Sequence, residues 1–350
     1  MEHGLKIEGL TFSYPGGPEL LRGADLRVLP GRCAAVTGGN GAGKSTLVKI
    51  AAGIIPSFQR GELRGGVAAG GRDGMPPAAV LQDLDSQLLR DTVEAELSFF
   101  LKYGGLSASP REAASGMGIE ELLPRDTATL SSGQKQRFLL ACGLYFSGGG
   151  TLILDEPNAF LDAEARALLA GRLAELKASG RSILLAGHDF TGFGGVVDDW
   201  YTLENGRLQP GRPARREGPA ARRAGPAGPA RLRAEGLSYT HGGTHRLLEP
   251  SSLELRAGAM TGLVGANGSG KTTVARLLSG FYAPPDGTVL FDGGAAGRAW
   301  LKENVRLVSA RPLNQLPGQT VEENLRCSLA SAGRRAPLSP TDPETDRTIA

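Results

Sequence analysis

The stretch GGNGAGKS at residues 38–45 matches G-x-x-x-x-G-K-[ST], the pattern of a phosphate-binding loop. A short apolar run at residues 33–36 precedes it, and a helix-like stretch at residues 46–50 follows it. The motif requires this order, because glycines let backbone N–H groups approach an anion and a helix N-terminus adds a positive dipole end. The stretch therefore predicts binding of a nucleoside triphosphate.

The same loop occurs again as GANGSGKT at residues 265–272, after the apolar run 261–264 and before the helix-like stretch 273–278. With 52 glycines in 350 residues, one chance match is not rare, but two chance matches in this context are far less expected, which disfavours the alternative of a pair of ordinary glycine-rich turns. The repeat indicates duplication. We expect nucleotide contacts at Gly38, Asn40, Gly41, Gly43, Lys44, Ser45 and Thr46, and at Gly265, Asn267, Gly268, Gly270, Lys271, Thr272 and Thr273.

Composition narrows the class of protein. The chain is 40% hydrophobic and 21% charged, as globular domains are, and its net charge of +3 is too small to indicate nucleic-acid binding. Its three cysteines are far apart and show no metal-ligand spacing, which favours a reducing cytosol. No apolar stretch of about 18 residues predicts a membrane span, and the N-terminus does not resemble a secretory signal.

Strand-like runs alternate with helical stretches over residues 5–208, which predicts an α/β fold with a mainly parallel sheet. The strand-like runs are residues 34–36, 78–81, 151–154 and 183–185. An Asn-Gly turn signal within residues 201–208 predicts a closing hairpin. We expect a complete unit at residues 3–208, a linker rich in Pro, Arg, Gly and Ala at 209–230, a partial second unit at 231–330 and a tail at 331–350.

Two acids, Asp155 and Glu156, end the apolar run at residues 151–154. Ligands of open parallel sheets bind where the strands end. Phosphoryl transfer to water needs a charge clamp, a metal ion, a positioned water and a base. We therefore expect Lys44 to reach the β- and γ-phosphates, and Ser45 and Asp155 to bind Mg²⁺. Glu156 is then placed to act as the general base.

A third segment, LSSGQKQR at residues 130–137, is the most specific one. Phe138, Ala141, Cys142 and Tyr145 follow at helical spacing, so a helix with an apolar face is predicted to begin near Ser131. Its N-terminus could meet a phosphate through hydroxyl and N–H donors. The alternative is a helix that is merely capped by a serine, and the neighbouring motifs disfavour it.

Together, the phosphate loop, the Leu-Ser-x-Gly-Gln signature and the Asp-Glu-Pro sequence resemble the ATP-binding subunit of an ABC transporter. The likeness covers nearly all of residues 5–208 and the first half only of the second unit. It implies a P-loop NTPase in which an antiparallel β subdomain and a helical subdomain accompany the main sheet. It also implies ATP hydrolysis, with ATP and Mg²⁺ as cofactors.

The resemblance assigns further roles. Gln82 resembles the loop glutamine that senses Mg²⁺ and the attacking water, His188 the switch histidine at the γ-phosphate, and Tyr14 the aromatic residue that stacks on adenine. A core histidine and a packing tyrosine are the respective alternatives for the last two. The signature residues expected at the nucleotide are Ser131, Gly133 and Gln134. Two departures stand out: Ser132 where glycine is commoner, and Ala159 where the dimer-contact loop usually has serine.

Residues 12–17 and 81–88 resemble the ATPases of energy-coupling factor importers, which take up vitamins or transition-metal ions; Asp85 and Gln87 resemble an acidic-Gln pair found there. This resemblance implies a location at the cytoplasmic face of the membrane. It also implies a transmembrane coupling subunit, a substrate-binding membrane subunit and a second ATPase domain, from a homodimer or a paralogue, as partners, and no nucleic acid. A soluble ABC-family ATPase acting on ribosomes or DNA is the rival, but it usually carries coiled-coil insertions that are lacking here.

The second copy is expected to lack half of the site. Lys44 and Ser131 are 87 residues apart (131 − 44), and 271 + 87 gives 358, beyond residue 350. Alignment of the copies puts Ala310 opposite Gln82 and His241 opposite Tyr14. We expect the second loop to bind nucleotide but scarcely to hydrolyse it, and the last third to be poorly ordered or unstable alone. A truncated, catalytically silent product of a longer gene is the alternative.

Overall fold

The computed structural model describes residues 4–69, 76–146, 150–212, 228–241, 245–309 and 316–331. The chain divides into two compact units, Met1–Gly218 and Pro219–Ala350. Most of the expected linker and of the expected tail, together with Ala310, lies outside the described residues. Within those residues, no helix combines the length and the apolar character needed to cross a bilayer.

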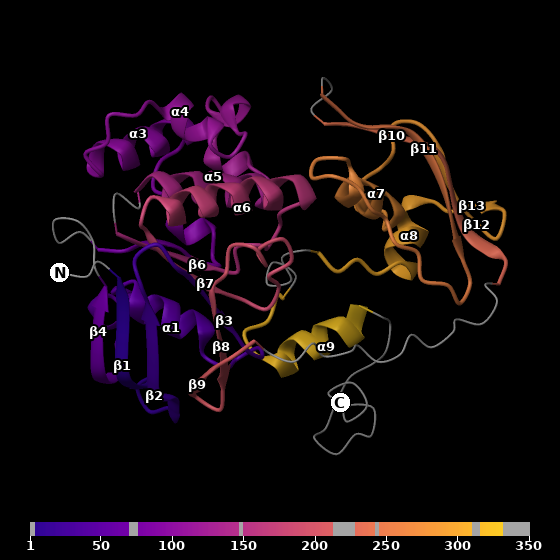
Figure 1. Cartoon of the computed structure of the whole chain (residues 1–350). Helices are drawn as coiled ribbons and strands as arrows, with labels where there is room; N and C mark the ends of the chain where they lie inside the picture. The colour runs from indigo at the N-terminus through magenta and orange to yellow at the C-terminus, as the bar shows by residue number, and fades with distance from the viewer. Residues whose placement is uncertain are drawn as a thin grey trace, which may run out of the picture. The chain divides into compact units, whose positions relative to one another are not determined.

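A six-stranded sheet in the order β5-β6-β7-β3-β8-β9 forms the centre of the first unit (Figure 1). Its first five strands run parallel, and β9 pairs antiparallel with β8 through the predicted Asn205-Gly206 turn. Every residue of β3, β6 and β7 is buried, as expected for strands covered on both faces. The predicted parallel sheet is thus confirmed. Its strands are β3 (Cys33–Thr37), β5 (Ala78–Val80), β6 (Thr151–Asp155), β7 (Ser182–Ala186), β8 (Asp199–Glu204) and β9 (Arg207–Pro210).

A second, antiparallel sheet of the order β2-β1-β4 covers one side of the first unit (Figure 1). Its strands are β1 (Leu5–Ser13), β2 (Glu19–Val28) and β4 (Glu62–Ala69). Helix α1 (Lys44–Ala51) is followed by the short α2 (Ile54–Ser57). Leu47 and Val48 of α1 share one buried cluster with Leu5 and Phe12 of β1 and Val36 of β3. This packing fixes α1, and with it the loop that precedes it.

Helices cover the other side of the parallel sheet: α3 (Val93–Tyr103), α4 (Pro110–Ser115), α5 (Ser132–Phe146) and α6 (Ala163–Ala178). Short 3₁₀ turns lie at Asp85–Gln87, Glu120–Leu122 and Thr127–Thr129. Phe138 and Leu140 of α5 are fully buried in a core that also holds Leu152 of β6 and Met117. The predicted helix after the signature is confirmed, and its burial against β5 and β6 positions the signature at one end of the sheet.

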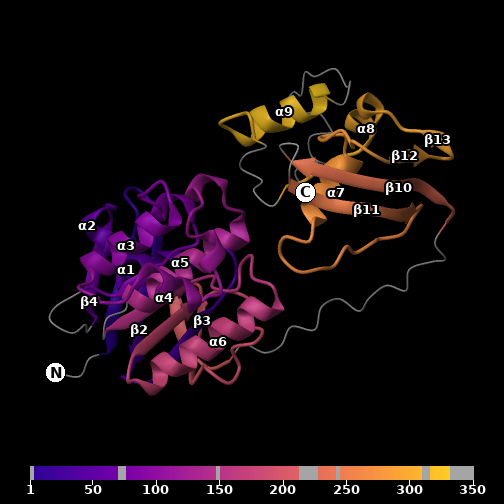
Figure 2. The same ribbon diagram turned by 90° about the horizontal axis from the view of Figure 1, so that it is seen from above.

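The second unit repeats the antiparallel sheet, with strand order β11-β10-β12-β13. Its strands are β10 (Ala230–His241), β11 (His245–Arg256), β12 (Thr288–Phe291) and β13 (Gly294–Ala295), and its helices are α7 (Lys271–Leu278), α8 (Arg298–Asn304) and α9 (Val321–Ser331). Figure 2 shows α7 beside β10 and β11. Val274 and Leu277 of α7 pack into the same cluster as Leu232 and Leu237 of β10.

One expectation was wrong. The apolar run at residues 261–264, expected to be the strand before the second loop, has no strand conformation. Leu263 is 53% exposed and Val264 is 93% exposed. In the first unit, the matching strand β3 lies between β7 and β8, whose first residues follow Lys44 by 138 (182 − 44) and 155 (199 − 44) positions. The described part of the second unit offers no such neighbours, so nothing pairs with this run.

Candidate functional site

The first phosphate loop joins β3 to α1, and its shape depends on glycine. Gly41 and Gly43 have φ values of 74° and 103°, a region that residues with a Cβ rarely adopt. At Gly38, a Cβ would lie 2.5 Å from the carbonyl oxygen of Leu203 on β8. The loop is therefore wound closely over the N-terminus of α1, with its N–H groups available to an anion.

Lys44 is the first residue of α1 and is only 7% exposed. Its Nζ donates hydrogen bonds to the carbonyl oxygens of Gly38, at 2.9 Å, and Gly39, at 3.1 Å. The ammonium group thus lies across its own loop, where phosphate oxygens could replace the two carbonyls. Lys271 does the same in the second unit, with Nζ at 2.7 Å from the oxygen of Gly265 and 2.6 Å from that of Ala266.

Asp155 ends β6 beside this loop and is 2% exposed. Its carboxylate accepts a hydrogen bond from the Ser45 hydroxyl, and its Oδ1 is buried without a partner in the described part of the chain. Burial raises the pKa of Asp155, with the Glu156 charge adding to the rise, whereas Ser45 and Lys44 lower it. A buried carboxylate oxygen left without a partner next to a hydroxyl fits a divalent cation, and oxygen ligands are those Mg²⁺ prefers. The described residues hold no group of three His, Cys, Asp or Glu side chains suited to a metal.

Glu156 and His188 face each other. His188 Nδ1 lies 2.8 Å from Glu156 Oε2, and the side chains are 70% and 12% exposed, respectively. The Glu156 N–H also donates to the Ala186 carbonyl at 2.7 Å, which ties the ends of β6 and β7 together. The exposure of His188 excludes the alternative of a core histidine. A mostly buried carboxylate held by an imidazole where the strands end can orient a water molecule and accept its proton.

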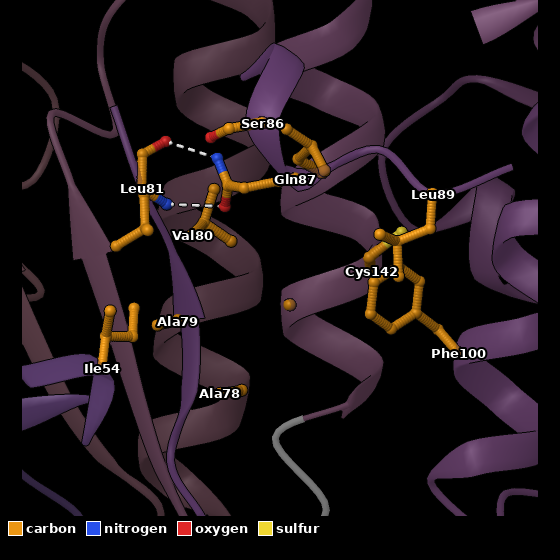
Figure 3. Close-up of a pocket in the computed structure, with 12 residues that line it drawn as sticks. Ile54, Ala78, Ala79, Val80, Leu81, Ser86, Gln87, Leu89, Phe100 and Cys142 are labelled. Atoms are coloured by element: carbon orange, nitrogen blue, oxygen red, sulfur yellow. Dashed lines mark hydrogen bonds between the residues drawn. The ribbon is translucent and has the colours of Figure 1, made fainter. Parts of the chain in front are cut away.

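Gln82 is exposed, and its side chain makes no hydrogen bond among the described residues, so none joins it to Ser45 or Asp155. Its neighbour Gln87 is firmly held instead. Gln87 Oε1 accepts the Leu81 N–H at 2.8 Å, and its Nε2 donates to the Leu81 carbonyl at 2.9 Å (Figure 3). Gln87 therefore fixes the backbone from which Gln82 projects.

Tyr14 is half-buried and lies beside the phosphate loop. Its hydroxyl is 3.1 Å from the Thr46 Oγ1 of α1, and its ring meets the Phe12 ring edge-on at a centroid distance of 4.9 Å. Both contacts suit a packing aromatic, and neither excludes stacking on adenine, which stays a prediction. The side chain of His241, its counterpart in the second copy, lies outside the described part of the chain.

Ser131 is exposed at the start of α5, and Gly133 is buried. The Ser131 N–H donates to Gln134 Oε1 at 3.0 Å, and the Gln134 N–H donates to Ser131 Oγ at 3.3 Å. This reciprocal pair is a capping box, so the serine does cap the helix. The cap occupies the Gln134 side chain but leaves Ser131 at the surface, where a phosphate could still approach it. One turn into the helix, buried Lys135 pairs with Asp85 at 2.6 Å.

The second phosphate loop copies the first in backbone shape. Gly268 and Gly270 have φ values of 84° and 86°, like Gly41 and Gly43. Thr272 and Thr273 follow at the start of α7. The first loop has Asp155 and Glu156 beside it, where β6 ends. Within the described residues, no strand that ends in an acidic residue lies beside the second loop. Its geometry supports nucleotide contact and supplies no base.

Sequence reasoning missed Asn158. It is 5% exposed, and its Nδ2 donates to the carbonyl oxygens of Asp189 and Thr191, each at 3.0 Å. A buried amide in the loop that follows two acids was the available signal. Its partners lie more than 30 residues away, so no local pattern could identify them.

A glycine-wound phosphate loop, a lysine across it and two acids on the adjoining strand end define a P-loop nucleoside triphosphatase. The model of the ABC transporter family matches residues 21–159 and 248–349, more than half of the chain. The chain therefore belongs to the ABC transporter family and is an ATP hydrolase, as the motifs indicated.

Known proteins with similar sequences agree. The "Cobalt import ATP-binding protein CbiO" of Rhodobacter capsulatus is 35% identical over 58% of this chain and 76% of that protein. A "Putative ABC transporter ATP-binding protein" of Methanosarcina mazei is 28% identical over 94% of this chain and 72% of that protein. A solved ATP-binding subunit of an ABC transporter superposes with a TM-score of 0.51 and 26% identity, covering 59% of this chain and 89% of that one.

Proposed function

We propose that this chain is the ATPase of an importer for a transition-metal ion or a vitamin, and that it acts at the cytoplasmic face of the membrane. The observation that carries the ATPase part is the meeting of the Lys44 loop, Asp155 and the Glu156–His188 pair at one edge of the parallel sheet. The likeness to a cobalt import ATP-binding protein supports the choice of cargo. The choice between metal ion and vitamin is left to experiment.

Each residue of the site has a separate role in hydrolysis. Lys44 exchanges the carbonyls of Gly38 and Gly39 for the β- and γ-phosphate oxygens of ATP. Ser45 and Asp155 hold Mg²⁺, which neutralises charge on the phosphates when it is bound. Glu156 orients the attacking water and accepts its proton, while His188 holds the carboxylate of Glu156 in place. Gln82 makes no hydrogen bond to this site in the structure, and its exposed side chain would have to turn toward the nucleotide to act there.

The signature end of α5 needs a nucleotide from elsewhere. Ser131 is at the surface, and its capping box leaves its hydroxyl able to turn to an incoming phosphate. We propose that a second ATPase domain, from another copy of the chain or from a paralogue, presents its phosphate loop to Ser131. The loop around Lys271 would bind ATP without hydrolysing it, since no base stands beside it among the described residues.

A membrane partner would dock at the cavity shown in Figure 3. This cavity has a volume of about 310 Å³ and is lined mainly by apolar residues of β5, α3 and α5, among them Val80, Phe100 and Cys142. Leu89 stands at its rim, 64% exposed. We propose a helix with an apolar face as the occupant, because that is the shape an apolar groove between helices accepts. Such a helix would contact both the Gln82–Gln87 segment and the signature helix.

Uptake of radiolabelled cobalt tests the cargo. Cells that lose the gene should lose ATP-dependent cobalt accumulation, and the wild-type gene should restore it, whereas a Glu156→Gln gene should not. Normal uptake in the deleted strain would reject cobalt, and the same strain can then be tested for vitamin uptake.

Docking is tested separately with Leu89→Glu, which should remove the chain from the membrane fraction while its ATP hydrolysis in solution persists. Leu29→Glu is the matched control, because Leu29 is also exposed and lies outside the cavity. Equal membrane association of the two variants would contradict the docking site.

A further inference from the structure

Two loops carry the Glu156–His188 pair: residues 156–162 after β6 and residues 187–191 after β7. Glu156 has a φ of 52°, in the left-handed region. For a residue with a Cβ this conformation costs about 1–2 kcal/mol, so it persists only where surrounding contacts hold it. Those contacts therefore matter for the position of the carboxylate.

Asn158 also joins the two loops directly, from its side chain to the backbone. It is 5% exposed, and its Nδ2 donates to the carbonyls of Asp189 and Thr191, at 3.0 Å each. Its Oδ1 is buried and has no partner within the described residues. A flipped amide would turn this oxygen against two carbonyl oxygens, so the acceptors fix the orientation of the side chain. One amide thus holds the backbone one and three residues beyond His188.

Gly187 leaves room for the pair. A Cβ on Gly187 would lie 3.0 Å from Glu156 Oε2, the oxygen that meets His188. The φ of Gly187 is not in the left-handed region, so its backbone conformation does not require glycine. The space favours glycine, because a methyl group there would crowd Oε2, which would have to shift by a few tenths of an ångström beside the imidazole.

Arg166 reinforces the link from α6. Its Nε donates to the Leu161 carbonyl at 3.1 Å, and its Nη1 lies 3.7 Å from Asp189 Oδ2. Asp189 in turn accepts the Thr191 N–H at 2.9 Å. Arg166 therefore joins the two loops at a second place, besides the bonds of Asn158.

We propose that Asn158 is a positioning residue, which couples the loop after β6 to the loop after β7 so that His188 meets Glu156. It acts through the two backbone carbonyls and does not touch the nucleotide. The proposal rests on the proposed function, in which Glu156 is the base and His188 holds it. Without these bonds, the backbone beyond His188 loses two of its anchors, and we expect the pair to open more readily.

A double-mutant cycle tests this role. In the full-length chain, Asn158→Asp replaces the two donors by an oxygen that faces two carbonyls, and kcat for ATP should fall by about tenfold to a hundredfold, with KM and ATP affinity nearly unchanged. His188→Ala should also lower kcat. If Asn158 acts through His188, adding Asn158→Asp to His188→Ala should cost less than about twofold more.

Controls separate positioning from folding. Asn324→Asp is the matched control, because Asn324 Nδ2 also donates to two backbone carbonyls, those of Gly318 and Thr320, but in the second unit. It should leave kcat unchanged. If Asn158→Asp fails to fold, Asn158→Ala is measured in the same cycle.

Gly187→Ala tests the second loop independently and should also lower kcat. Gly194→Ala, where a Cβ meets nothing within 4 Å, should not. Full additivity of Asn158→Asp with His188→Ala, or wild-type kcat in Asn158→Asp, would overturn the proposal. A His188→Ala variant with normal turnover would instead reject the role proposed for His188 in the site itself.

Discussion

His188 Nδ1 lies 2.8 Å from Glu156 Oε2, and the register of two parallel strands explains why. Asp155 at the end of β6 pairs with Ala186 at the end of β7. The residues that follow these two positions therefore leave the sheet side by side, and the Glu156 N–H bonds to the Ala186 carbonyl. Glu156 and His188 are 32 positions apart in sequence (188 − 156), and they meet because the strands that precede them end at the same level of the sheet.

Glu156→Gln should abolish turnover and keep ATP binding. The amide is nearly the same size as the carboxylate and can still contact His188, but it cannot accept a proton from water. A general base contributes about 10²–10⁴-fold, so we expect kcat to fall by at least about a hundredfold. Steady-state phosphate release measures turnover, and titration with a fluorescent ATP analogue measures binding. Retention of steady-state hydrolysis would show that another group is the base.

Lys44→Ala should weaken ATP binding by about tenfold or more, because it removes the only cation that lies across the first loop in the described structure. The matched substitution is Lys271→Ala, since Lys271 makes the same two bonds in its own loop. Titration of a fluorescent ATP analogue should resolve two sites in the wild type and one in each variant. Only Lys44→Ala should also lose hydrolysis. Unchanged affinity in Lys44→Ala would contradict the assignment of the first loop.

Asp155→Asn should stabilise the nucleotide-free protein while removing its activity. Burial penalises the charged carboxylate, the nearby Glu156 adds repulsion, and the amide oxygen of Asn can still accept the Ser45 hydrogen bond. A gain of about 1 kcal/mol corresponds to a rise in Tm of about 2–4 °C for a unit of this size. Thermal unfolding without nucleotide measures the gain. A fall in Tm would show that the charge itself stabilises the fold.

Local patterns predicted much of this protein. Apolar runs that end at a residue with a proposed chemical role, such as the run before Asp155, correctly predicted the buried strands. The helical spacing after Ser131 correctly predicted α5. Long-range pairing could not be predicted. The run at residues 261–264 has the composition of a strand and lacks neighbours, because the strands that flank β3 come much later in the chain. Nor does any local signal show that Asn158 or Gln87 bonds to backbone across a loop.

Glu96 gives a pH-dependent prediction. It is fully buried on α3, and its Oε2 accepts the N–H groups of Leu89, at 2.9 Å, and Arg90, at 2.5 Å. Burial is the largest cause that raises the pKa of Glu96, and the two backbone bonds oppose it. The folded state therefore keeps the proton to higher pH than the unfolded state does. The contribution of Glu96 to the free energy of unfolding is therefore fully present below its pKa in the unfolded state. It is lost as pH rises through the raised pKa of the folded state.

Glu96→Gln removes this titration and keeps an acceptor for the two N–H groups. The free energy of unfolding of the wild type, measured relative to this variant by urea denaturation, should therefore decline as pH is raised from about 4 to about 8. Exposed Glu94, on the same helix, supplies the control: Glu94→Gln should leave the difference from wild type nearly constant over the same range. A difference between wild type and Glu96→Gln that grows with pH would show that the backbone bonds outweigh burial and that the carboxylate is stabilised as the anion.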